Sequence, residues 1–218
     1  MRKINAFTLA EVLITLVVIG VVAAFAIPAL LQSTMNIEYK VGYKKAYSDV
    51  SRGVLASIAF GDFPERTEKF DFDITNEEWN ILKKQFGIAK LCENNNAYDC
   101  WVDSERLCIG CGSSSNQGVP GAHTKVFIDL SGRSWALYST NENIYIVDVN
   151  GDKKPNQVGK DRWIFTFADK NGKRICAGEP CSNPDVPAQV IPLLGDVKSK
   201  DSYFCPHPPC YFKSWLIN

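Results

Sequence analysis

The sequence lacks any excess of charge, because its 218 residues contain 24 lysines and arginines and 24 aspartates and glutamates. A formal net charge of zero excludes a global field that would recruit nucleic acid or anionic lipid. Histidine is scarce, with two residues, and there is no phosphate-binding loop, serine-hydrolase elbow or zinc-protease motif. The sequence therefore predicts a protein that is not an enzyme. A local basic group, Lys40, Lys44 and Lys45, is ordinarily explained as a solvated helix face.

Charge is also absent from one long apolar run near the amino terminus. Between Glu11 and the next charged residue, Glu38, lie 26 uncharged residues. About 20 residues suffice for a helix to cross a bilayer, so this run predicts a membrane-spanning helix. A carboxylate placed in lipid costs roughly 2.5 to 3.5 kcal/mol, which makes Glu11 a candidate functional residue.

Residues 6–16, with the sequence AFTLAEVLITL, follow a short basic leader, and Pro28 lies further along the run. This segment resembles the prepilin amino terminus of type IV pilins and of type II secretion pseudopilins. The resemblance implies that a prepilin peptidase cuts between Ala6 and Phe7 and that Phe7 becomes an N-methylated amino terminus. It also implies that Glu11, the fifth residue of the product, is required for filament assembly. Ala6 stands where the family usually has glycine.

The same resemblance implies a domain organisation and a set of partners. Residues 1–6 are the leader, residues 7–35 the transmembrane and assembly helix, and residues 36–218 a pilin-like globular domain. The chain would be a structural subunit of a type IV pilus or a type II secretion-like filament. It would first lie in the inner membrane as a single-pass protein and then in an extracytoplasmic or cell-surface filament. Its partners would be other pilins, the prepilin peptidase and an inner-membrane assembly platform, and nucleic acid is not an expected partner.

Two other interpretations of the amino terminus stay open. Residues 24–26, Ala-Phe-Ala, fit the pattern that signal peptidase cuts, although the apolar run continues to Leu31. Alternatively, the run is a plain single-span anchor with Glu11 near the interface. The chain would then be a membrane-anchored, disulfide-rich extracytoplasmic binding module that does not polymerise.

Eight cysteines behind a membrane-targeted amino terminus predict an oxidising compartment and a disulfide framework. They fall into two groups of four, which predicts pairing within each group: Cys92, Cys100, Cys108 and Cys111, then Cys176, Cys181, Cys205 and Cys210. Because Cys108 and Cys111 have C-x-x-C spacing, a zinc or thiol redox site is the alternative for that pair.

Hydrophobic periodicity predicts an α+β fold. One helix should run from about Thr8 to Phe60, with its second half amphipathic. The predicted apolar stripe of that half consists of Ile37, Val41, Tyr47, Val50, Val54 and Ile58. Five β-rich runs separated by turn signals predict an antiparallel meander of four or five strands, stapled by disulfides, with one face that buries this stripe. These runs are residues 125–130, 135–139, 143–149, 163–168 and 174–176.

The segments before this meander are predicted to contain little sheet. A capping box at residues 75–78 predicts a short helix that ends near Gly87. Residues 89–121 are rich in Asn, Ser, Gly and Cys, and we expect them to form a loop held by disulfides.

The connection at residues 148–161 carries oxygen side chains at alternate positions, Asp148, Asn150 and Asp152, as do the first three ligand positions of a calcium loop. Asp161 is a further candidate ligand, but Gly159 occupies the place of the usual bidentate glutamate. The alternative is a turn whose side chains cap backbone donors. The sequence thus establishes no cofactor, and it offers calcium as a candidate in a weak structural site.

Overall fold

The computed structural model describes residues 8–59, 83–84, 86–92, 99–101, 124–138, 144–168, 189–192, 195–198, 205 and 208–217. In chain order its elements are α1 (Leu9–Ala59), β1 (Ile88–Cys92), β2 (Thr124–Asp129), β3 (Ser134–Tyr138), β4 (Ile144–Asp148), β5 (Arg162–Ala168), β6 (Gln189–Pro192) and α3 (Ser214–Ile217). The chain divides into two compact units, Met1–Glu38 and Tyr39–Asn218, and α1 contributes residues to both.

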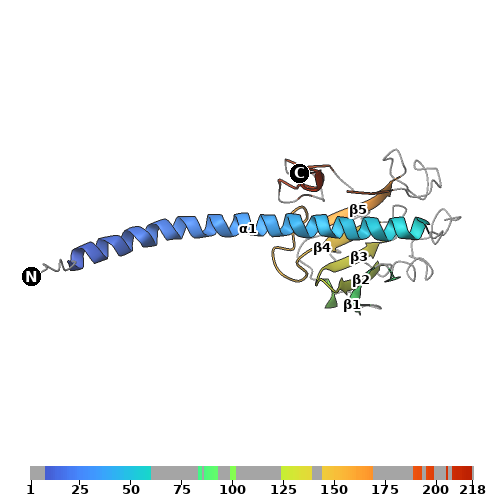
Figure 1. The fold of residues 1–218 in the computed structure, drawn as a ribbon, viewed down its shortest axis with the longest axis horizontal. Helices are drawn as coiled ribbons and strands as arrows, with labels where there is room; N and C mark the ends of the chain where they lie inside the picture. The colour runs from blue at the N-terminus through green and yellow to red at the C-terminus, as the bar shows by residue number, and fades with distance from the viewer. Residues whose placement is uncertain are drawn as a thin grey trace, which may run out of the picture. The chain divides into compact units, whose positions relative to one another are not determined.

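The six strands form one antiparallel sheet in sequence order, β1-β2-β3-β4-β5-β6 (Figure 1). Residues paired across the sheet form rows that alternate between its two faces. One row contains Val126, Ala136, Ile146 and Ile164, and the next contains Phe127, Trp135, Val147 and Trp163. All eight side chains are buried, so both faces of the sheet are covered. The predicted α+β class and the antiparallel meander are confirmed.

Strands β2 to β5 lie within one or two residues of the runs predicted for them. The prediction was wrong for residues 89–92, which belong to β1 rather than to a loop, and it missed β6. Strand β1 shows no polar and apolar alternation, since three consecutive residues, 89–91, are exposed. Pairing with β2 at the sheet edge decides its conformation. The predicted strand at 174–176 and most of the predicted helix from Thr75 lie outside the described residues.

The second half of α1 packs on one face of the sheet through a stripe that differs partly from the prediction. Its buried residues are Tyr39, Tyr43, Ala46, Val50 and Val54, at helical spacings of three and four. Val50 and Val54 were predicted correctly. Ile37 and Val41 were not, because each is 61% exposed. Tyr39 and Tyr43 take their place in the core. Each tyrosine buries its apolar ring while its hydroxyl donates to a backbone carbonyl.

Tyrosine hydroxyls fix the helix to segments far along the chain. Tyr43 stacks on Trp163 with ring centroids 4.4 Å apart, and its hydroxyl donates to the carbonyl of Phe212 at 2.5 Å. Burial raises the pKa of the Tyr43 hydroxyl far above its ordinary value, so it stays a donor. Tyr47 donates to the carbonyl of Val190 in β6 at 2.9 Å. The helix face is therefore held by directional bonds as well as by apolar burial.

The opposite face of the sheet is covered by a small disulfide-linked cluster. Cys92 in β1 is bonded to Cys100, and the adjacent Trp101 is 1% exposed. Trp101 packs with the Val126 row of the sheet. Its ring also lies 4.6 Å from the guanidinium carbon of Arg162, a cation–π contact. The sequence analysis predicted that the helix covers one face of the sheet. It did not predict what covers the other face.

The carboxy-terminal segment folds against the β4–β5 connection. A disulfide joins Cys205 to Cys210, and Cys210 forms two backbone hydrogen bonds with Val197. Gly159, with φ of +81°, lies under this disulfide, so closely that a Cβ there would be 2.3 Å from Cys210 Cβ. Glycine is required at that position both for backbone conformation and for close approach.

Replacement of Gly159 by alanine is expected to destabilise the globular unit much more than replacement of Gly132. The two residues have nearly the same φ, +81° and +80°, so each alanine should suffer similar left-handed strain of about 1–2 kcal/mol. Only at Gly159 would the new Cβ collide with Cys210, because nothing lies within 4 Å at Gly132. Urea unfolding of the full chain in detergent, followed by tryptophan fluorescence, measures both losses. Equal losses would contradict this packing.

Candidate functional site

Glu11 lies in the first turn of α1 and is already hydrogen-bonded to its own chain. Thr8 precedes the helix and supplies two donors to Glu11 Oε2, its backbone N–H at 2.8 Å and its hydroxyl at 2.7 Å. In return, the Glu11 N–H donates to Thr8 Oγ1 at 3.3 Å. This is a reciprocal capping box, in which a Thr and a Glu three residues apart satisfy donors of the first turn. Among the described residues, Glu11 Oε1 accepts no hydrogen bond.

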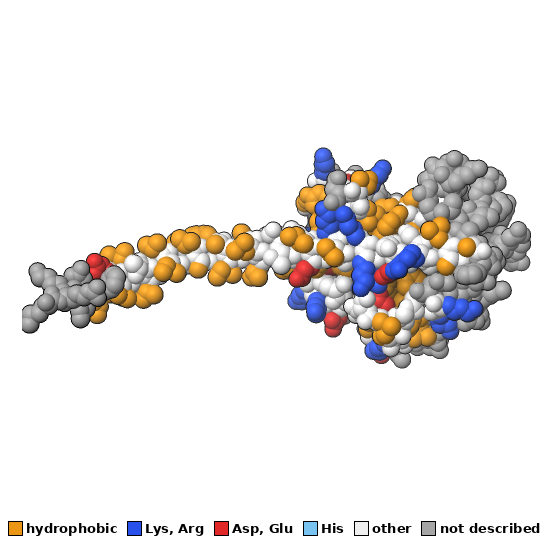
Figure 2. All heavy atoms as spheres, in the orientation of Figure 1, with side chains coloured by type: hydrophobic (Ala, Val, Ile, Leu, Met, Phe, Trp, Pro, Cys, Tyr) orange, Lys and Arg blue, Asp and Glu red, His pale blue; other side chains and the backbone are white. Residues whose placement is uncertain are grey.

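The rest of the described first unit is an apolar helix whose large hydrophobic side chains are exposed in the part of the chain that the structure describes. Leu9 and Phe25 are 78% and 77% exposed. One helix in the described residues is long and apolar enough to cross a membrane, and it begins at Leu9. Figure 2 shows hydrophobic side chains along this part of α1, with one acidic group near its start. Such a surface requires an apolar environment around it.

Pro28 lies inside α1, and the helix continues through it to Ala59. The missing N–H of the proline costs one helical hydrogen bond, but it does not end the helix. The predicted cleavage and methylation residues, Ala6 and Phe7, lie outside the described residues.

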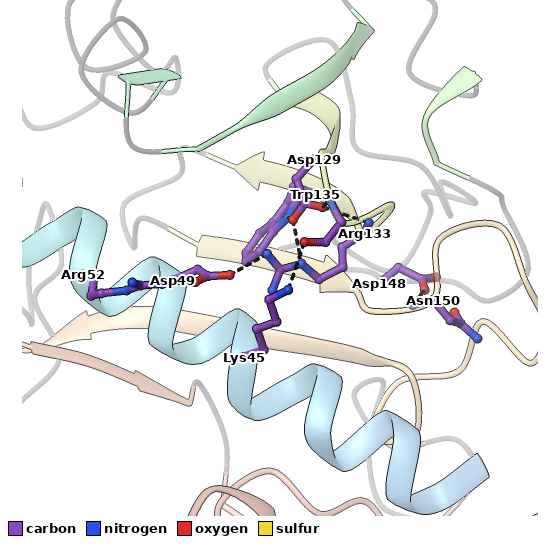
Figure 3. Close-up of polar contacts among 9 residues, drawn as sticks. Lys45, Asp49, Arg52, Asp129, Arg133, Trp135, Asp148 and Asn150 are labelled. Carbon is purple, nitrogen blue, oxygen red and sulfur yellow. Dashed lines mark hydrogen bonds and ion pairs between the residues drawn. The ribbon is translucent and has the colours of Figure 1, made fainter. Parts of the chain in front are cut away.

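A polar clamp attaches the second half of α1 to the β2–β3 turn (Figure 3). Arg133 bonds Asp49 of α1 through Nη2 at 2.6 Å and Asp129 at the end of β2 through Nε at 2.6 Å. Asp129 also accepts from Trp135 Nε1 at 2.8 Å. Burial pushes the pKa of Asp49 upward, but hydrogen bonds from Arg133 and Arg52 outweigh it and hold this pKa below its ordinary value. The clamp is structural, because its groups bond one another.

In the β4–β5 connection, two of the four predicted calcium ligands are buried beside an arginine. Asp148 Oδ2 accepts from Arg162 Nε at 2.7 Å, and Asp148 Oδ1 accepts from the Asn150 N–H at 3.3 Å. Asp161 accepts from the backbone N–H groups of Asn156 and Gln157 at 2.7 and 2.6 Å. Burial raises the pKa of Asp148 to about 7, although Arg162 opposes this rise. Burial likewise raises the pKa of Asp161.

The other polar side chains of the β4–β5 connection, at Asn156 and Asp152, are not arranged around a common point as calcium ligands would be. With its amide nitrogen facing the acceptors, Asn156 donates to Asp148 Oδ2 at 3.0 Å and to the carbonyls of Gly151 and Lys153. Asp152 is exposed. Within the described ranges, no group of three or more His, Cys, Asp or Glu side chains is arranged to hold a metal. Because Arg162 takes the place of a cation beside Asp148, the geometry favours the self-contained turn, and calcium binding stays a prediction.

Four of the eight cysteines lie in the described part of the chain, and none of these four is free. The bonds Cys92–Cys100 and Cys205–Cys210 each join members of one sequence group, which confirms the predicted local pairing for these residues. Cys108, Cys111, Cys176 and Cys181 lie outside the described residues, so the alternative of a metal or redox site at the C-x-x-C pair stays a prediction.

A family model described as the prokaryotic N-terminal methylation motif matches residues 1–27. The amino terminus is a prepilin-type signal. The match spans the predicted cleavage site, Phe7 and Glu11, and it ends before Pro28. The chain matches no curated protein, and it matches no solved structure. The similarity therefore concerns the amino-terminal segment alone.

Sequence reasoning identified Glu11 in this prepilin-type signal but missed its partner. The pattern Thr8-x-x-Glu11 is itself the capping-box signature, which could have been found from the printed residues. The arginines at 133 and 162 carried no such signal, because their partners come from other elements of the fold. Arg133 lies between two predicted β-rich runs and Arg162 directly precedes one, where a charged residue is ordinarily assigned to solvent.

Replacement of Arg162 by methionine should leave Asp148 buried without its counter-charge, at a cost of about 3–5 kcal/mol. Arg52→Met is the matched control, since Arg52 is 76% exposed in its pair with Asp49 and should lose about 0–1 kcal/mol. Removal of the guanidinium raises the folded-state pKa of Asp148 above its wild-type value of about 7. The stability deficit of Arg162→Met should therefore grow as the pH rises from about 7 towards the higher pKa of the variant, because the buried carboxyl ionises there without a counter-charge. Urea unfolding at several pH values measures it. A deficit equal to that of Arg52→Met would contradict the buried pair.

Addition of calcium tests the β4–β5 connection directly. If the turn is self-contained, the melting temperature of the full chain should be the same in excess calcium and in excess chelator, because ligands that bind only the folded state raise stability. Differential scanning calorimetry makes the comparison. A rise in melting temperature with calcium, abolished by Asp161→Asn, would instead establish the site predicted from the sequence.

Proposed function

We propose that this chain is a structural subunit of a pilus-like or pseudopilus-like filament and not an enzyme. The observation that carries the proposal is the position of Glu11, a lone carboxylate at the start of an exposed apolar helix within a methylation motif. In the family that this signal resembles, the helix serves first as a membrane anchor and then as the filament core. The chain offers one apolar helical surface that suits both environments.

Processing would prepare the helix for assembly. A prepilin peptidase would cut after Ala6, expose the amine of Phe7, and leave Thr8 and Glu11 as the second and fifth residues of the product. The capping box does not involve the leader, since both of its side chains lie after the cut. It would therefore survive processing and keep the carboxylate bonded within the membrane, where an unsatisfied acid is costly.

Pairing between subunits would use the other carboxylate oxygen. Glu11 Oε2 accepts both bonds from Thr8, and Oε1 accepts none among the described residues. The Phe7 amine of a neighbouring subunit at about 4 Å would gain about 4 kcal/mol at an effective dielectric near 20, before desolvation. A subunit in the wrong register would leave that acid unpaired. The pairing would thus select correct register during assembly on an inner-membrane platform.

The variant Glu11→Gln should insert in the membrane and be cleaved, because glutamine has nearly the same shape as glutamate. It should fail to enter filaments, because its neutral amide cannot pair with the charged Phe7 amine of a neighbouring subunit. Thr8→Val should reduce incorporation, since it removes one of the two donors to Oε2, and Thr8→Ser is the matched control that keeps the hydroxyl. Sheared surface filaments, compared with the membrane fraction by immunoblot, measure incorporation. Normal filament content in Glu11→Gln cells would refute the pairing.

The alternative is a single-span anchored module that does not polymerise. It would keep the same apolar helix and the same disulfide-linked sheet, because both belong to an extracytoplasmic domain of either kind. The two functions differ in where the wild-type protein is found. An anchored module would be absent from sheared filaments under every condition.

A further inference from the structure

One group of charged side chains forms no ion pair in the described residues and has no part in the amino-terminal signal. Eight lysines lie at or near residues 39–45 of α1. Three belong to this part of the helix, and five belong to segments that are linked to it by contacts. We call them the basic surface: Lys40, Lys44, Lys45, Lys153, Lys154, Lys160, Lys198 and Lys213. Each is exposed or half-buried.

Contacts between distant segments bring these lysines to the same end of the globular unit. The Tyr39 hydroxyl donates to the Lys154 carbonyl at 3.5 Å, which places the β4–β5 connection beside the first turn of this part of the helix. Six residues later in α1, Lys45 donates to Ser131 in the β2–β3 turn at 3.2 Å. Figure 2 shows blue side chains on and around this part of α1.

The carboxy-terminal lysines reach the same end through Tyr43. Its hydroxyl bonds the carbonyl of Phe212, the residue before Lys213. Two residues earlier, Cys210 pairs with Val197, which precedes Lys198, and packs on Gly159, which precedes Lys160. All eight lysines thus belong to segments joined by these contacts.

Charge is segregated in this chain, which is neutral overall. Among the described residues, the exposed acids next to these lysines in sequence are Glu38, Asp152 and Asp196, so eight lysines stand against three exposed acids, an excess of five. Residues 60–80, which follow α1, contain seven acids and two bases. A neutral chain that separates its charges in this way can attract an anionic partner locally.

Seven lysines of the basic surface make no side-chain hydrogen bond within the described residues, and Lys45 bonds Ser131 alone. The ion pairs in the described residues are made by Arg52, Arg133 and Arg162, and none of the eight lysines takes part in one. The arginines thus serve the fold, whereas the lysines present mobile, hydrated ammonium groups suited to diffuse contact with phosphates.

The position of these lysines in the sequence indicates which anion they meet. Lys40 follows Leu31, the end of the apolar run, by only nine residues of sequence. Surface potentials of anionic membranes act over a Debye length of about 10 Å beyond the head groups. Basic residues that flank a span are expected on the cytoplasmic side, where the leader has Arg2 and Lys3. Lys40, Lys44 and Lys45 on the outer flank oppose that bias and need another explanation.

We propose that the basic surface binds the head groups of anionic phospholipids while the subunit is anchored in the membrane. This inference rests on the proposed function, since it requires the apolar helix to lie in a bilayer. Lipid binding would hold the globular unit at the membrane surface, and the contacts would be lost when the subunit leaves the bilayer for a filament.

Lysine labelling of the full-length protein in vesicles tests the proposal. Vesicles of phosphatidylcholine alone are compared with vesicles that also contain phosphatidylglycerol, and an impermeant amine reagent is quantified at each lysine by mass spectrometry. Lysines of the basic surface should label about threefold more slowly, or slower still, with phosphatidylglycerol, and high salt should abolish the difference. The exposed Lys83, Lys84 and Lys90 are internal controls and should label equally in both.

A variant separates charge from fold. Lys40→Gln, Lys44→Gln, Lys153→Gln and Lys154→Gln combined should abolish protection of the remaining four lysines, and the matched triple Lys83→Gln, Lys84→Gln, Lys90→Gln should not. Equal labelling in both vesicle types would overturn the proposal, as would salt-dependent protection by duplex DNA with none by phosphatidylglycerol. A protein that floats with neither vesicle type would contradict the membrane anchor and thus the proposed function. Flotation separates that failure from equal labelling, in which the protein is membrane-bound but its lysines do not contact the head groups.

Discussion

A carboxylate in an apolar helix requires hydrogen-bond donors, and this requirement governs the amino-terminal unit, Met1–Glu38. Thr8 meets it with two donors from one residue, placed by the geometry of a capping box. The same bonds satisfy orphan groups of the first helical turn, so Glu11 stabilises the helix that carries it. The interaction uses a single oxygen of the carboxylate. A second positive or donor group can therefore approach without first breaking the cap.

The globular unit follows a related rule, because three of its buried polar side chains bond to groups from other elements of the fold. Arg133 joins the helix to the β2–β3 turn, and Arg162 joins β5 to Asp148 at the end of β4. Tyr43 reaches the carboxy-terminal segment through a buried hydroxyl. Such bonds are strong in a low dielectric and costly to break, so they specify one arrangement of helix on sheet. Lysines remain on the surface, where their charge is available to partners.

Hydrophobic period and turn chemistry sufficed to predict the long helix and four of the six strands of the described sheet. The grouping of cysteines along the sequence predicted the pairing of the four that are described. The misses have a common cause. Val41 has an apolar side chain but points away from the sheet, and Tyr43 is buried because its hydroxyl finds an acceptor that is 169 residues away in sequence. In the same way, Asp148 resembles a metal ligand until Arg162 is seen beside it. Local pattern cannot supply partners that tertiary structure brings together. At Glu11 the partner among the described residues, Thr8, is local, so the printed sequence was enough to find it although it was missed.

The central claim is that Glu11 acts beside an amino terminus created by cleavage. Mass spectrometry of the amino-terminal peptide of the protein isolated from its native cells tests this most directly. The account predicts a chain that begins at Phe7 and carries one methyl group on its amine. A chain that still begins at Met1, or one cut after Ala26, would have no such amine next to the capping box and would contradict the account.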